Sequence, residues 1–100
     1  MASLRIPEPA TDMEGQFRSL AETWRKDTRH SSSLVKMIMH PAYLRIIGFG
    51  PSVVPLLLRA LRDRPDHWLV ALKATTGVDP APEGSTFTEA VQAWLAWGQG

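Results

Sequence analysis

The fold is decided by the stretch GPSVVPLLLRAL at residues 50–61. Apolar side chains would cover most of the circumference of a helix built from it, namely Val53, Val54, Leu56, Leu57, Leu58, Ala60 and Leu61. A helix that is apolar nearly all round belongs in the centre of a fold. Ser52 is the predicted N-cap, and Pro55 then falls in the first turn, where its missing N–H costs little.

A longer helix is predicted over residues 12–27, with Asp12 as its cap. One apolar stripe of 3.6-residue period supports it, formed by Met13, Phe17, Leu20 and Trp24. Residues 1–11 hold two prolines and few apolar side chains, so we expect a flexible N-terminal segment there and a single helical domain over residues 12–98.

Two short helices are predicted between these segments. The serines at 31–33 supply capping hydroxyls for a helix over 34–39. Pro41 suits the first position of a helix over 42–47. Gly48 is the predicted left-handed residue that closes it.

Two further helices are predicted in the last third of the chain. Pro65 and Asp66 begin one that ends at Gly77, with Asp66 as its cap. Thr86 and Glu89 have the spacing of a capping box, in which each side chain satisfies a backbone donor of the other, and this last helix is expected to end at Gly98.

The sequence therefore predicts an all-α fold. No segment shows sustained period-2 alternation, and neither Asn-Gly nor Asp-Gly, the common hairpin signals, occurs. Five or six short helices with short connections indicate a compact bundle in which neighbouring helices pack as antiparallel hairpins.

Composition excludes several classes of protein. One hundred residues suffice for one core. The absence of cysteine excludes disulfides, a thiol nucleophile and a zinc site with thiolate ligands. No apolar run approaches the length of a membrane span, and no signal-peptide pattern is recognised, so we expect a cytoplasmic protein without membrane contact.

Residues 40–82, HPAYLRIIGFGPSVVPLLLRALRDRPDHWLVALKATTGVDPAP, resemble a group of small, uncharacterised bacterial proteins. The shared elements are HPAY, IIG, PLLLR, PDHW and TG, followed by WLxWG at residues 94–98. This resemblance assigns no catalytic residue. Residues 50–61 are also similar to the opening of the second helix of a HEAT repeat. Because stacked repeats need about three units and only one is present, a HEAT-like helical hairpin inside the bundle is expected.

The sequence contains no residue pattern typical of a catalytic site or a metal site. The three histidines lack metal-ligand spacing. Asp63, Asp66 and His67 are the best grouping for a metal or for acid–base chemistry, but a helix cap and arginine ion pairs explain them better. We therefore predict no enzyme, no metal and no cofactor.

The preferred hypothesis is a small helical protein-interaction module of the antitoxin, immunity or accessory-subunit type. The expected partner is another protein encoded nearby, and self-association is the second option. Aromatic residues often dominate interface energies, and the predicted contact residues are Tyr43, Phe49, Trp68 and Trp97. Trp97 is either an exposed anchor or a further core residue.

The alternative hypothesis is a nucleic-acid-binding regulator. All eleven Lys and Arg residues lie before residue 77, and the cluster predicted to meet phosphates is Arg25, Lys26, Arg29 and Lys36. A helix-turn-helix would use residues 33–39 and 41–47 as its pair of helices. Against this hypothesis, both helices are short and mostly apolar, with few side chains able to read base edges.

Overall fold

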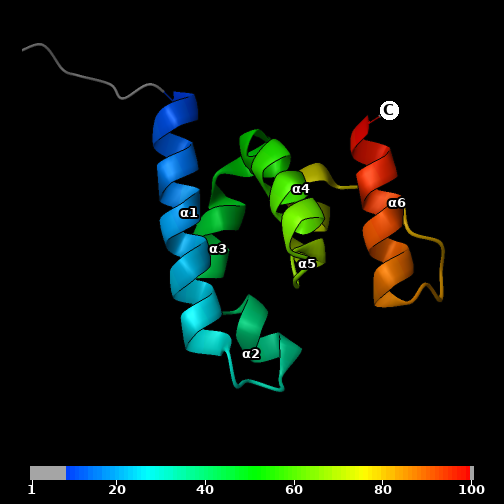
Figure 1. The fold of residues 1–100 in the computed structure, drawn as a ribbon, viewed down its shortest axis with the longest axis horizontal. Helices are drawn as coiled ribbons and strands as arrows, with labels where there is room; N and C mark the ends of the chain where they lie inside the picture. The colour runs from blue at the N-terminus through cyan, green and yellow to red at the C-terminus, as the bar shows by residue number, and fades with distance from the viewer. Residues whose placement is uncertain (1–8, 100) are drawn as a thin grey trace, which may run out of the picture.

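This computed structural model describes residues 9–99 of the chain, which contain six α-helices and one 3₁₀ helix (Figure 1). The elements are α1 (Pro9–Thr28), α2 (Leu34–Ile38), α3 (Pro41–Gly48), η1 (Gly50–Val53), α4 (Val54–Asp63), α5 (Leu69–Thr76) and α6 (Phe87–Gln99). No strand occurs within these residues. The predicted all-α bundle of five or six short helices is therefore confirmed.

The main packing partners are not consecutive helices. α1 packs chiefly against α3, and α4 against α6, while α5 contacts both α3 and α4 (Figure 1). The chain bends by 107° between Pro41–Gly48 and Gly50–Asp63. The expectation that neighbouring helices pack as antiparallel hairpins therefore does not hold for the largest contacts, which join α1 with α3 and α4 with α6, although the consecutive helices α4 and α5 do contact each other.

No single helix of residues 9–99 is long and apolar enough to cross a membrane. The segments Pro41–Gly48 and Gly50–Asp63 reach the required length and composition only together, across their bend.

Two helix starts follow the local sequence signals. The Lys36 N–H donates to Ser33 Oγ at 3.3 Å, so the serine run does cap α2. At α6, the Thr86 N–H donates to Glu89 Oε1 at 2.8 Å and the Glu89 N–H donates to Thr86 Oγ1 at 3.1 Å. Both bonds of the predicted capping box are thus present.

Several predicted helix boundaries are wrong. α1 begins at Pro9, so Asp12 lies within the helix and residues 9–11 are helical; residues 1–8 of the predicted flexible segment lie outside the described residues. Ser52 lies inside η1, which occupies the turn before α4. The left-handed residue after α3 is Gly50, with φ +74°, because α3 extends through Gly48.

Gly98 does not end the last helix, which continues to Gln99. A Cβ at this position would lie 2.7 Å from Leu58 Cδ1. The glycine therefore allows α6 to approach α4 closely.

Large aromatic residues make up the centre of the core. Trp24, Tyr43, Trp68 and Trp94 are fully buried. The Tyr43 and Trp68 rings stack at 5.6 Å with 7° between their planes, and Trp24 lies 4.6 Å from Trp68 between centroids. Each such pair contributes about 0.5–1.5 kcal/mol beyond the burial of apolar area. These contacts join α1, α3 and the segment leading into α5.

The Tyr43 hydroxyl supplies the missing cap of α5. It accepts a hydrogen bond from the Ala71 N–H at 2.9 Å and donates to the His67 carbonyl at 2.8 Å. Ala71 is in the first turn of α5, whose N-cap residue Trp68 provides no side-chain bond. The predicted start at Pro65–Asp66 is therefore wrong: Asp66 Oδ1 binds the adjacent His67 N–H, and a residue 28 positions away caps the helix.

Replacing Tyr43 by Phe should lower the free energy of unfolding by about 1–3 kcal/mol, because the Ala71 N–H and the His67 carbonyl would lose their buried partner while the ring stack remains. Chemical denaturation followed by tryptophan fluorescence measures this. An unchanged unfolding midpoint would show that the hydroxyl contributes nothing to stability.

Ionisation of the same Tyr43 hydroxyl at alkaline pH should destabilise the fold and unfold the protein. Burial raises the pKa of the Tyr43 phenol, the hydrogen bond from Ala71 lowers it, the Asp66 charge raises it, and the net pKa is well above its usual value. The neutral phenol therefore stabilises the fold fully below pH about 10, and this contribution is lost as the pH rises further.

Tyr43 is the only tyrosine, so tyrosinate absorbance should appear together with unfolding. Between pH about 10 and the pH at which the protein unfolds, the free energy of unfolding of Tyr43→Phe should fall less than that of the wild type. Equal decreases in the two proteins would contradict this prediction.

Candidate functional site

A polar groove of about 850 Å³ lies between the C-terminal half of α1 and the segment that joins α4 to α5. We call it the basic groove; it is lined by Ser19, Glu22, Thr23, Arg25, Lys26, Thr28, Arg29, Ser31, Met37, Arg64, Asp66 and His67. Four of these side chains are Lys or Arg and two are carboxylates. The α1 members at 22, 25, 26 and 29 share one helix face because they are three or four residues apart.

Arg25 is the most restrained cation of the groove. Its Cζ lies 5.8 Å from the Trp68 ring centroid, and its Nε lies 3.6 Å from Asp66 Oδ2. This distance permits an ion pair but is too long for a good hydrogen bond, and the Nε atom is buried without a hydrogen-bond partner. The Arg25 side chain is only 25% exposed, so its guanidinium group is recessed and held in place.

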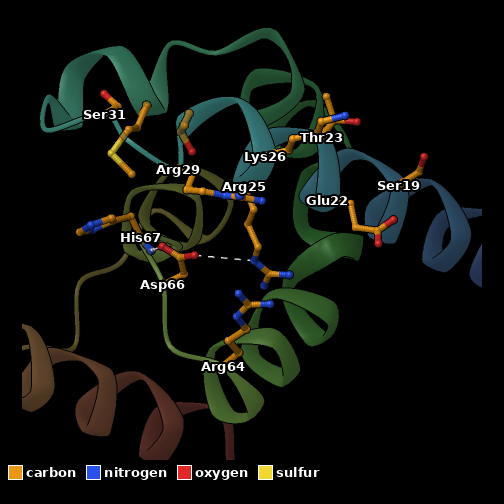
Figure 2. A pocket seen from close by; sticks show the side chains of 12 residues that line it. Ser19, Glu22, Thr23, Arg25, Lys26, Arg29, Ser31, Arg64, Asp66 and His67 are labelled. Atoms are coloured by element: carbon orange, nitrogen blue, oxygen red, sulfur yellow. Dashed lines mark hydrogen bonds and ion pairs between the residues drawn. The ribbon is translucent and has the colours of Figure 1, made fainter.

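Arg64 enters the groove from the opposite side. Figure 2 shows Arg25 of α1 and Arg64, which follows α4, pointing toward each other, with Asp66 beside Arg25. Among the side chains that the structure describes, Arg64, Lys26 and Arg29 form no ion pair. The like charges of Arg25 and Arg64 therefore converge in a groove whose lining also carries the carboxylates of Glu22 and Asp66.

The structure brings together part of the predicted nucleic-acid cluster. Arg25, Lys26 and Arg29 line the basic groove, whereas Lys36 lies on α2 and does not line it. Arg64 also belongs to this group, although the sequence pattern did not predict it. Nothing local identifies it, because it is 35 or more residues from the α1 cations and meets them only through the packing around Trp68.

The predicted protein interface is wrong for two of its four residues. Tyr43 and Trp68 are fully buried, so neither can touch a partner directly. Phe49 is half-buried and packs against the core. Trp97 is 40% exposed and lines a cavity of about 480 Å³ between α4 and α6. Its ring packs edge-to-face with that of Trp94, with 5.2 Å between the ring centroids. Its role as an anchor stays a prediction.

An apolar surface lies elsewhere, on α2 and α3. Its exposed apolar side chains are Leu34, Val35, Met39 and Leu44. Leu34 and Val35 lie on α2 and Met39 is its C-cap residue, whereas Leu44 lies on the exposed side of α3. We call these four residues, with the exposed Lys36 and Arg45, the α2–α3 surface.

The α2–α3 surface belongs to a stretch of the chain that has basic but no acidic residues. Residues 28–62 contain five Arg or Lys and no Asp or Glu. The preceding acid, Asp27, is engaged: its Oδ2 lies 2.8 Å from His40 Nε2, while His40 Nδ1 accepts the Ala42 N–H and so caps α3. Because Nδ1 acts as the acceptor, Nε2 carries the proton that faces Asp27.

The other predicted chemical groups have structural partners. Asp63 Oδ1 accepts from Arg62 Nε at 3.0 Å, so the predicted arginine ion pair is present, and Asp66 pairs with Arg25. Within residues 9–99, no three His, Asp or Glu side chains lie close enough to hold a metal ion.

Comparison of the chain with protein-family models, with curated proteins and with solved structures found no match. The resemblances to small bacterial proteins and to HEAT repeats therefore stay predictions, and the site geometry alone supports the functional argument.

Replacing Arg25 by Ala should lower the free energy of unfolding by about 1 kcal/mol, because its side chain covers the face of Trp68. Lys26→Ala is the matched control on the same helix, since Lys26 is exposed and forms no ion pair with the described side chains. Urea denaturation of both variants measures the difference. Equal stability of the two variants would show that the contact with Trp68 is not stabilising.

Proposed function

We propose that this protein is a small helical interaction module that binds an acidic, amphipathic helix of a partner protein on the α2–α3 surface. The observation that carries the proposal is α2 itself. Its sequence is LVKMI, yet none of its five residues is buried. A helix this short has little stability of its own. Met37 and Ile38 pack partly against the core, and the remaining exposure of Leu34, Val35 and Met39 is explained if a partner covers them.

Both energy and charge support this partner. Fully burying an exposed apolar side chain contributes about 1.5–3 kcal/mol. The four apolar side chains of this surface are 44–66% exposed, so about half of that gain per residue remains for a partner. Lys36 and Arg45, within the stretch of 35 residues that lacks acids, favour carboxylates at the rim of the contact. Such charges steer association and select the partner more than they add to affinity.

The proposal keeps the predicted class of function and changes its contact residues. Val35 and Met39 replace the buried Tyr43 and Trp68. A binding role without catalysis, in the cytoplasm of a bacterium and with a partner encoded nearby, forms part of this proposal.

Val35→Asp should abolish the contact, because it places a carboxylate where we expect the partner to bring apolar and acidic side chains. Val78→Asp is the matched control: Val78 is also an exposed valine, 43% against 66% for Val35, and follows α5. The probe is a synthetic helical peptide with leucine on one face and glutamate on the other. The comparison peptide carries lysine in place of glutamate.

Calorimetry should show binding of the acidic peptide to the wild type and to Val78→Asp, with at least about tenfold weaker binding to Val35→Asp. The lysine peptide should not bind. No preference between the peptides, or equal losses in both variants, would reject the proposal. Light scattering tests the other occupant: a dimer that Val35→Asp dissociates would show that a second copy covers this surface.

A further inference from the structure

We infer that the basic groove binds a small phosphate-bearing anion. This site is separate from the α2–α3 surface and does not depend on the proposed partner. The inference starts from the charges of the lining side chains. Arg25, Lys26, Arg29 and Arg64 face the groove, and the carboxylates are Glu22 and Asp66. Asp66 is already paired with Arg25.

The convergence of Arg25 and Arg64 indicates where the anion binds. Two guanidinium groups that point toward each other repel, and the repulsion is stronger where water is partly excluded (Figure 2). An anion between them would convert this repulsion into two charge-assisted contacts. Phosphate fits because guanidinium groups bind its oxygens through paired N–H donors.

Arg25 is arranged in advance for this role. Its contacts with Trp68 and Asp66 hold the side chain, and its Nε is buried, 3.6 Å from Asp66 Oδ2. The two Nη atoms are therefore the donors left for a ligand. Because the position of the group is fixed before binding, little conformational entropy is lost when the anion arrives.

The shape of the groove favours a small ligand over a nucleic-acid duplex. A volume of about 850 Å³ lies within the range of sites for small molecules. Arg25 is recessed, so the phosphates of a broad duplex would meet the exposed Lys26 and Arg29 first. Serine and threonine hydroxyls at Ser19, Thr23 and Ser31 supply further hydrogen bonds for the rest of a phosphorylated molecule.

The test uses pyrophosphate as the probe, with the full chain at low ionic strength. Calorimetry should show saturable 1:1 binding to the wild type. Arg64→Gln should weaken it at least tenfold, while Arg62→Gln, which removes an exposed arginine outside the groove, should change it less than about twofold. Circular dichroism checks that both variants remain folded, as expected for exposed side chains.

Amide NMR should place the shifted resonances at the lining residues, including Arg25 and Arg64. Val35→Asp should bind pyrophosphate as the wild type does, so a failure of the docking proposal would be seen separately. Absence of saturable binding, or equal losses in Arg64→Gln and Arg62→Gln, would overturn the inference. A duplex oligonucleotide that binds more tightly than pyrophosphate and is weakened by Arg64→Gln would show instead that the groove contacts a nucleic-acid backbone.

Discussion

The structure depends on one buried contact between α3 and the start of α5: Tyr43 stacks on Trp68 and places its hydroxyl between the His67 carbonyl and the Ala71 N–H. The ring fixes how close the two elements lie, and the hydrogen bonds fix where α5 begins. Trp24 adds α1 to the same cluster, and its Nε1 donates to the Met37 carbonyl of α2 at 2.8 Å. Three fully buried aromatic residues thus hold four helices, which is how so short a chain makes a core.

The same contact shapes the surface of the protein. Trp68 is a core residue on one side and supports Arg25 on the other, so the recessed guanidinium position is a consequence of core packing. Asp66, two residues earlier, completes the fixation of Arg25. The basic groove is therefore built on a rigid support, whereas α2, attached through few core contacts, is a surface that a partner can cover at little cost in stability.

Sequence patterns predicted what depends on near neighbours. The Thr86–Glu89 capping box, the Ser33 cap and the helical class follow from residues within one or two turns of each other. Prediction failed where a distant group displaced the local candidate. Asp66 is a good cap by residue type, but the Tyr43 hydroxyl takes its place at α5. Periodicity also cannot separate a buried from an exposed aromatic residue: Trp68 and Trp97 look alike in sequence, and only tertiary packing buries the first.

The exposure of α2 follows from the same packing. The core surface of α1 and α3 near α2 is already occupied by Trp24 and Tyr43, which are both fully buried. What remains for α2 is the partial burial of Met37 and Ile38 and the hydrogen bond to the Met37 carbonyl. Leu34, Val35 and Met39 consequently remain 46–66% exposed and lie close in the sequence to Lys36 and Arg45, the combination of apolar and basic side chains on which the proposed binding of an acidic helix rests.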